Sequence, residues 1–321
     1  MEAIGRFFAG AYEEAREELK SRAPIRLAGV LLASALLFGC AASRKRTIAP
    51  SAIRPVLEAS ASELAAVYNS QARAVESLNA TVRMTPVAGS EYSGVIQEYH
   101  EVGGFILMAQ PAMIRVIGQA PVVSKNIFDM VSDGQTFHIF IPSKNQFLEG
   151  STALERAARN PIENLRPQHV LDAFFWPQLP VAAPLLFEQS EALPERYYIL
   201  TGLRSAEGRL EIDRKIWFDR ADLRIVRVQV YGPGGRLDAD VAYADWQPGD
   251  TASAPAGAGL LFPRRIVIRR PQQDYQLTVM ITKLMLNAEI SADRFVLAQP
   301  PGTKLVRVGQ DEPNSQPTIQ P

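Results

Sequence analysis

Few residues of this chain have the types and spacing that chemistry requires. Cys40 is the only cysteine among 321 residues, so it cannot form an internal disulfide or a multi-thiolate metal site. His100, His138 and His169 lack the close spacing of paired metal ligands, and an imidazole in mid-strand is ordinarily structural. The sequence contains no nucleophile elbow, phosphate loop or dinucleotide fingerprint, which predicts a non-enzyme without metal or cofactor. Four carboxylates could act as an acid–base pair only if the fold brought them together: Asp129, Asp133, Asp213 and Asp219.

Cys40 follows an apolar run from Leu27 to Phe38, with Arg22 and Arg26 just before it. The run has the length of a signal-peptide core and is shorter than the roughly 20 residues that span a bilayer. Leu37-Phe38-Gly39-Cys40 resembles a bacterial lipobox, although Phe38 is bulkier than is usual there. The resemblance implies cleavage before Cys40 and acylation of that residue. A buried helix and an uncleaved membrane anchor are the alternatives.

Four segments follow from this pattern and from composition. Residues 1–39 are interpreted as a signal peptide with an acidic N-terminal extension, and 40–56 as a basic, proline-containing lipidated tether. Residues 57–308 form the predicted domain, and 309–321 a disordered tail. The formal charge is +0, so the sequence gives no reason to expect nucleic acid as a partner.

Hydrophobic periodicity predicts a mainly β (α+β) domain. Apolar residues recur every three or four positions from Leu57 to Leu78, which is typical of a long amphipathic helix. Beyond it the period becomes two, with turn residues such as Asp133-Gly134 between the runs. The predicted strands are 79–86, 92–102, 104–109, 112–119, 126–132, 135–141, 145–150, 196–203, 209–218, 223–231, 236–246, 262–269 and 274–286.

The strands are interrupted between 151 and 195, where residues 166–179 and 182–193 have the pattern of two short, proline-broken helices. We expect one sheet with a helical insertion. A sheet this wide seldom stays flat, so the predicted architecture is a curled, incomplete antiparallel β-barrel with a helical lid. The turn at Pro121, Val122 and Val123 has an apolar tip, which either packs back onto the body or contacts a membrane or a partner.

Apolar alternation also predicts which side chains point inward. A one-residue register error would exchange inside for outside, and inward residues could equally fill a solid core. The predicted cavity lining is Ile106, Met108, Ile114, Val116, Val226, Val228, Ile266, Ile268, Val279 and Ile281, and the predicted lid residues are Phe174, Phe175 and Leu186.

The order of several motifs resembles the LolA/LolB group of lipoprotein carriers over about Leu57 to Pro301. The motifs are "GGFILMAQPAMIRVIGQAPVV", "FDMVSDGQTFHIFIPSKNQFLEG", "KIWFDRADLRIVRVQVYGPGGRLDADVAYADW" and "LLFPRRIVIRRPQQDYQLTVMITKLMLNAEISADRFVL". The resemblance implies an incomplete barrel around an apolar cavity that holds acyl chains, with helices as a lid. It matches Val122 to the tip of a membrane-contact loop in the lipid-anchored LolB branch, where leucine is the expected residue.

The resemblance and the lipobox together predict an outer-membrane-anchored lipoprotein on the periplasmic face. Ala41 and Ala42 follow the cysteine without an aspartate, which the sorting rule for bacterial lipoproteins associates with the outer membrane. The expected monomer would bind lipoprotein acyl chains or another lipid, receive them from a LolA-like carrier and aid their transfer to the membrane. The alternative is an envelope lipoprotein that senses lipid or acts as a scaffold with the same fold, and an envelope hydrolase is a third, weaker hypothesis.

Overall fold

The computed structural model describes six stretches of the chain: residues 55–90, 95–120, 125–153, 166–191, 195–251 and 259–308. All of them belong to one compact unit, Arg54–Pro321. Cys40, the predicted signal peptide, the turn at 121–123 and the tail at 309–321 lie outside the described residues, so their interpretations stay predictions.

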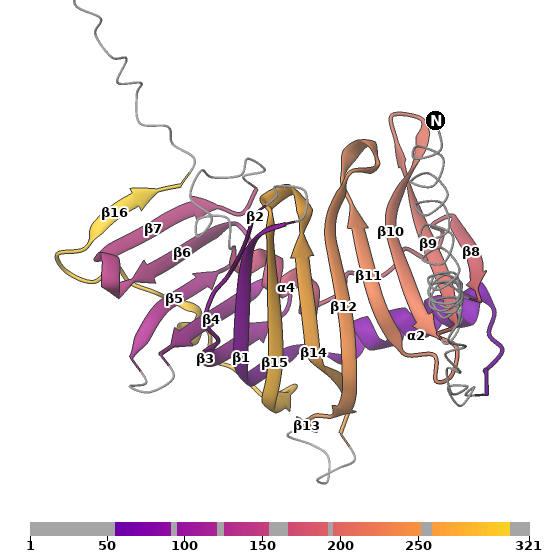
Figure 1. The fold of residues 1–321 in the computed structure, drawn as a ribbon, viewed down its shortest axis with the longest axis horizontal. Helices are drawn as coiled ribbons and strands as arrows, with labels where there is room; N and C mark the ends of the chain where they lie inside the picture. The colour runs from indigo at the N-terminus through magenta and orange to yellow at the C-terminus, as the bar shows by residue number, and fades with distance from the viewer. Residues whose placement is uncertain are drawn as a thin grey trace, which may run out of the picture. The chain divides into compact units, whose positions relative to one another are not determined.

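Sixteen strands form one open sheet (Figure 1). Along it the strands lie in the order β16-β7-β6-β5-β4-β3-β1-β15-β14-β12-β11-β10-β9-β8, while β2 pairs with β1 and β13 with β15. Pairing is antiparallel except between β16 and β7 and between β13 and β15. The bounds are β1 (Ser77–Ser90), β2 (Val95–Glu98), β3 (Val102–Ala109), β4 (Met113–Gln119), β5 (Asn126–Ser132), β6 (Thr136–Ile141), β7 (Gln146–Ser151), β8 (Leu185–Ser190), β9 (Tyr197–Ala206), β10 (Arg209–Asp219), β11 (Ile225–Tyr231), β12 (Leu237–Pro248), β13 (Asp250–Thr251), β14 (Leu261–Arg270), β15 (Tyr275–Leu286) and β16 (Lys304–Arg307).

The predicted mainly β, incomplete antiparallel architecture is confirmed, and the sheet does not close into a barrel. Strands before and after 151–195 join in the same sheet through β1 and β15. The two ends of the sheet, β8 and β16, have no further partner strand within the described part of the chain. An open sheet must have its apolar face covered by other elements, because that face cannot be left in water.

Two helices provide part of this cover. Helix α2 (Ala61–Ala74) contacts β8 and β9 and lies behind that end of the sheet in Figure 1. Helix α4 (Pro167–Phe174) contacts β4, β5 and β14. α2 is shorter than the predicted helix at 57–78, because Ser60 caps its start and Val75 is already extended.

The second predicted insertion helix is wrong. Within residues 182–193, Leu185–Ser190 form β8, which pairs with β9 in unbroken register. The sequence pattern there is short and apolar, and such runs cannot be assigned to helix or strand from periodicity alone. The availability of β9 as a backbone partner decided the outcome.

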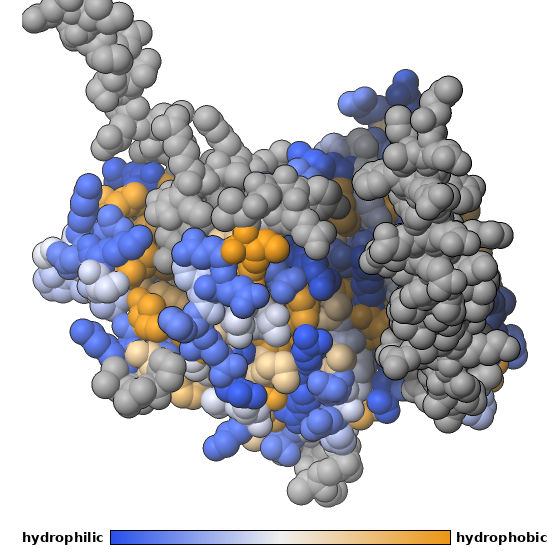
Figure 2. All heavy atoms as spheres, viewed as in Figure 1, coloured by the Kyte–Doolittle hydropathy of each residue, from blue (hydrophilic) through white to orange (hydrophobic). Residues whose placement is uncertain are grey.

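The last described segment, which we name the C-terminal strap (residues 287–308), crosses the outer face of the sheet. The Asn287 N–H donates to Ser77 O at 2.9 Å, and the Arg115 guanidinium on β4 donates to Arg294 O at 2.9 Å. Phe295, within the strap, is buried. The strap then ends as β16, which extends the sheet beside β7 and was not predicted. On the face seen in Figure 2, hydrophobic side chains are scattered among hydrophilic ones.

Candidate functional site

The inner face of the sheet is the candidate site, because it gathers the residues that the sequence predicted to point inward. Nine of the ten predicted lining residues are buried in one hydrophobic core cluster. They come from β3, β4, β11, β14 and β15, so the topology unites segments far apart in sequence. These nine are Ile106, Met108, Ile114, Val116, Val228, Ile266, Ile268, Val279 and Ile281.

Val226, the tenth predicted lining residue, is only partly buried and lies outside the core cluster. β11 pairs Arg227 with Trp217 but Ile225 with Phe218, so one extra residue is inserted at Val226. Such a bulge reverses the alternation of side chains beyond it. Ile225 and Val228 therefore face the core instead.

The cover over this face consists of α2, α4 and the segment 175–184 that follows α4. α2 presents Leu64, Tyr68 and Ala72 to the core, one residue every four positions. The predicted lid residues Phe174 and Phe175 are both buried, and the Phe174 ring lies 6.0 Å from that of Phe262 on β14. Leu186, the third, is on β8 and is 54% exposed.

Specific polar contacts attach the cover to the sheet. The Trp176 indole N–H donates to the Tyr243 hydroxyl at 2.7 Å, and that hydroxyl donates to Ala173 O at 2.9 Å. Burial raises the pKa of Tyr243 well above its usual range, so the hydroxyl keeps its proton. Asn69 on α2 exchanges two hydrogen bonds with the backbone of Leu179, at 3.1 and 2.8 Å. These bonds join the parts of the cover to one another and to β12.

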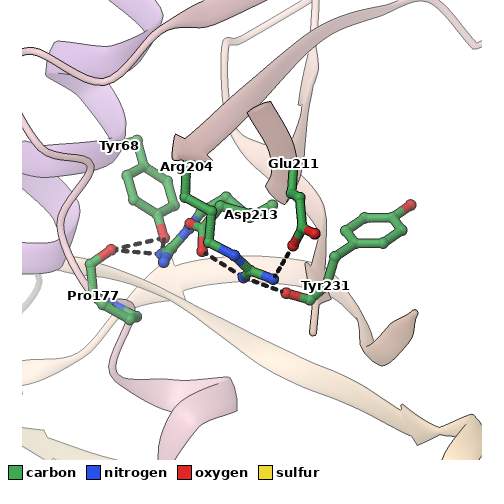
Figure 3. A network of polar contacts seen from close by, with 7 residues as sticks. Tyr68, Pro177, Arg204, Glu211, Asp213 and Tyr231 are labelled. Atoms are coloured by element: carbon green, nitrogen blue, oxygen red, sulfur yellow. Dashed lines mark hydrogen bonds and ion pairs between the residues drawn. The ribbon is translucent and has the colours of Figure 1, made fainter. Parts of the chain in front are cut away.

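Arg214 on β10 also contacts the cover, through Tyr68 and Pro177, which are labelled in Figure 3. Its guanidinium donates to the Tyr68 hydroxyl at 3.0 Å and to Pro177 O at 2.8 Å, while the hydroxyl itself donates to Pro177 O at 3.1 Å. Desolvation raises the pKa of Tyr68, and the positive charge of Arg214 partly opposes that shift. One charged side chain of the sheet thereby holds both α2 and the segment after α4.

Local backbone features place Arg214 there. β10 pairs Ile212 with Leu203 but Arg214 with Gly202, so Asp213 is an inserted residue and Arg214 turns inward. A Cβ built on Gly202 would lie 3.2 Å from the Leu179 side chain, so a larger residue there would require Leu179 to shift by a few tenths of an ångström. Arg214 is not among the residues that the sequence predicts to point inward. One pattern in the sequence could have predicted it: Arg214 lies two residues before Ile216, and side chains two residues apart on a strand face the same side.

The same network continues outward to a second arginine. Asp213 accepts from Arg214 Nε at 2.7 Å and lies 3.5 Å from Arg204. Arg204 also pairs with Glu211 at 3.3 Å and donates to Tyr231 O at 2.8 Å. Arg204 has no hydrogen bond to the cover among the described contacts, which makes it a natural control for Arg214 (Figure 3).

The cover and the inner face pack directly against each other. Tyr68, Trp176 and Leu179 belong to the same buried cluster as the inner-face residues. Two hollows lined by described residues lie at the surface. One, of about 300 Å³, includes Phe105 and Ala120, and the other, of about 490 Å³, includes Glu76 and Asn287.

The candidate catalytic residues are dispersed. His100 is exposed, His138 stacks on Phe147 with ring centroids 5.4 Å apart, and His169 contacts the Tyr275 hydroxyl at 2.7 Å.

The four predicted carboxylates have separate local roles. Asp129 pairs with Arg115 at 2.7 Å, Asp133 accepts two backbone N–H bonds in its turn, and Asp219 accepts from the Ala221 N–H at 2.8 Å. Asp213 belongs to the arginine network described above. Within the described ranges, no three His, Cys, Asp or Glu residues come together in a way that could hold a metal ion.

The ends of the predicted membrane-contact turn are well defined. The Ala120 N–H donates to Lys125 O at 2.9 Å, and the Gln119 amide donates to Asn126 Oδ1 at 3.1 Å. Pro121, Val122 and Val123 lie outside the described residues. No helix in the described part of the chain has the length and apolarity that crossing a membrane requires.

No protein-family model matches the sequence, and no curated protein matches it. Several solved structures match the fold. A DUF1329 family protein from Desulfovibrio piger is 13% identical, with a TM-score of 0.48, and the match covers 74% of this chain and 95% of that one. A LolA superfamily protein from Nitrosomonas europaea is 13% identical, with a TM-score of 0.43, and the match covers 75% of this chain and 99% of that one. A domain assigned as an outer membrane lipoprotein-sorting protein from Vibrio parahaemolyticus is 9% identical, with a TM-score of 0.46. That match covers 74% of this chain and 97% of the domain. The LolA superfamily, which the sequence resembles, is thus among the groups whose solved structures match this chain.

Proposed function

We propose that this chain is a lipid-anchored lipoprotein of the outer membrane, facing the periplasm, that binds lipoprotein acyl chains or another lipid and aids their transfer to the membrane. The ligand would lie between the inner face of the sheet and its cover. The process involves no covalent chemistry. Acyl chains carry a large hydrophobic penalty in water, about 0.8 kcal/mol for each methylene, which an apolar surface removes.

The observation that carries this proposal is the way in which the cover is attached. A wide apolar face is overlaid by separate short elements, and a few polar contacts join them to the sheet. A hydrogen bond to a charged group contributes about 1.5–3 kcal/mol net. The Arg214 contacts are therefore strong enough to hold the cover closed and weak enough to be exchanged for a bound acyl chain.

Because the cover packs directly on the sheet, a ligand must displace it to enter. Arg214 is well placed to control this step, since it binds both α2 through Tyr68 and the following segment through Pro177 O. Displacement would uncover the nine inner-face residues named above, together with Phe174 and Phe175. Leu186 would stay at the sheet edge.

The remaining parts of the proposal concern the membrane. Acylated Cys40 would anchor the chain, and Pro121, Val122 and Val123 would touch the bilayer during release. A LolA-like carrier would deliver the cargo, and directional transfer requires only that this chain bind the cargo more tightly than the carrier does.

Mass spectrometry of small molecules extracted from the full chain carrying Cys40→Ala, purified from bacterial cells, tests ligand binding. Near-stoichiometric lipid or acylated peptide is the expected result and would identify the class of cargo. Protein that is free of lipid and also fails to take up a fluorescent fatty acid would contradict carriage.

Arg214→Leu tests the role of the cover. The variant loses the charged contacts to Tyr68 and Pro177 O, so we expect a fluorescent fatty acid to enter about tenfold faster or more, the equivalent of about 1.4 kcal/mol in the opening step. Arg204→Leu is the matched control, because it removes an arginine of the same network that does not bind the cover. Equal uptake rates for both variants and the unmodified chain would show that Arg214 does not control entry.

The packed interior favours the second candidate, a lipid-sensing or scaffolding envelope lipoprotein with the same fold. Such a protein needs a stable cover and no exchange of ligand. A lipid-free chain whose uptake is unchanged by Arg214→Leu would support this function over carriage.

A further inference from the structure

The edge strand β8 has few of the features that usually protect a sheet edge from pairing with another strand. Among the described elements it pairs with β9 alone, over six residues and without a bulge. Leu186 and Phe187 on it are 54% and 38% exposed. Native sheets protect their edges with short strands, lysine, proline or bulges. The opposite edge, β16, follows that practice, with four residues bounded by Lys304 and Arg307.

The hydrogen-bond phase of β8 shows which of its backbone groups face outward. The Leu203 N–H donates to Pro184 O at 3.0 Å, so the carbonyl of Pro184 is directed toward β9. In an antiparallel ladder this direction alternates along the strand. Residues 186 and 188 therefore also face β9, while Leu185, Phe187 and Gln189 direct their N–H and C=O groups to the open edge.

From this arrangement we propose that β8 pairs antiparallel with β8 of a second copy of the chain, around a two-fold axis at Phe187. In this register Leu185 opposes Gln189 of the second copy, and Phe187 opposes its own counterpart. Every outward residue then meets an outward residue, and each such pair can exchange both of its backbone hydrogen bonds. The two sheets become continuous, which is the self-complementary contact that two-fold symmetry requires.

Charge and strand overlap favour this register over the two registers next to it. Glu188 opposes Leu186 of the second copy, so no like charges meet across the strands. If one strand is shifted by two residues relative to the other, Glu188 lies opposite Glu188 of the second copy, and the two negative charges repel each other. A shift in the other direction places Gln189 opposite Ala183, which lies outside β8. In the favoured register the two Phe187 rings extend the existing pair of Phe187 with Tyr198, whose centroids are 5.3 Å apart.

The expected dimer is weak in solution and favoured at a membrane. One pair of six-residue strands buries less than the total of about 1,200 Å² found in stable interfaces. Anchoring through Cys40 would raise the local concentration of copies and favour pairing without adding contacts. The dimer would replace the monomer expected from the sequence, and it does not depend on lipid binding.

Cysteine cross-linking in membranes tests the register. Cys40, the only cysteine of the chain, is kept as the acylated anchor, and acylation blocks its thiol, so each further variant reports one position. Opposed residues in a hydrogen-bonded pair have Cα atoms about 5.5 Å apart, which suits a disulfide. Phe187→Cys should therefore give a disulfide dimer on mild oxidation. Leu185→Cys and Gln189→Cys should each fail alone, because their counterparts lie more than about 10 Å away, but they should cross-link when expressed together.

Gln189→Pro, added to Phe187→Cys, distinguishes strand pairing from chance collision. Proline removes an outward N–H and leaves the pairing of β8 with β9 intact, so we expect loss of the dimer band. The proposal is overturned if Leu185→Cys cross-links as readily as Phe187→Cys. It is equally overturned if the band persists with Gln189→Pro, or if Phe187→Cys joins a different protein.

Discussion

At the residue scale, His169 is a titratable side chain whose surroundings disfavour its charged form. It lies on α4, and its ring stacks on Tyr275 with centroids 6.0 Å apart. Burial lowers the pKa of His169 well below its usual 6.5, and the positive charges of Arg270 and Arg166 lower it further. Burial also raises the pKa of Tyr275, so both partners are neutral near pH 7.

This environment predicts a pH-dependent stability. Below about pH 6.5 the unfolded chain binds a proton at His169, but the folded chain does not until its lower pKa is reached. The free energy of unfolding should therefore fall as the pH drops from 6.5 to 5.5, by up to about 1.4 kcal/mol for each pH unit. His169→Gln should remove this part of the slope, as measured by urea unfolding at both pH values.

The control is the same pair of chains between about pH 7.5 and 8.5, where His169 is neutral in both the folded and the unfolded state, so the two slopes should match. If His169→Gln left the slope between about pH 6.5 and 5.5 unchanged, the imidazole would not be held neutral by the fold.

At the element scale, the start of α2 depends on a complete capping box. The Ser60 side chain accepts from the Glu63 N–H at 3.3 Å, and the Ser60 N–H donates to Glu63 Oε2 at 2.8 Å. The backbone bond to Ser60 lowers the pKa of Glu63, which favours the charged partner of the box. The helix that this box starts contacts β8 and β9 at the end of the sheet.

Ser60→Ala should therefore lower the free energy of unfolding by about 1 kcal/mol, measured by urea denaturation. Ser70→Ala is the control, since Ser70 is an exposed residue within the same helix, and alanine there should be neutral or slightly stabilising. A loss with Ser70→Ala equal to that with Ser60→Ala would indicate that the cap is not the cause.

Most strand positions could be predicted from the sequence, but the face of the sheet to which each side chain points could be predicted only in part. β5 has the predicted bounds, because alternation and the turn at Asp133-Gly134 are local signals. The inserted residues Asp213 and Val226 carry no such signal. Each arises from the pairing of β10 with a neighbouring strand, and each changes which side chains beyond it face the core.

At the scale of the whole molecule, the C-terminal strap links the outer face to the β16 edge. Within it Phe295 is 6% exposed and its neighbour Val296 is 65% exposed. Phe295→Ala should cost about 3–5 kcal/mol, because a buried ring is lost and a cavity is left. Val296→Ala should change stability by no more than about 0.5 kcal/mol.

Thermal or urea unfolding of the two variants provides the comparison. Similar small effects for both would mean that the strap is not part of the cooperative unit and that β16 can detach from β7 independently. A large effect for Phe295→Ala alone is the expected result, since Arg115 on β4 and the strap backbone are already joined beside it.

Local sequence patterns predict the class of the fold, thirteen of the sixteen described strands, two of the covering elements and nine of the residues on the inner face. These follow from local alternation, turn residues and helix period, which act over a few positions. Long-range strand pairing accounts for three further features: the sheet stays open, Leu185–Ser190 form an edge strand, and Arg214 points inward to the cover. Those outcomes depend on which strands become neighbours across long sequence separations, and a backbone partner such as β9 overrides what a short apolar segment would otherwise prefer.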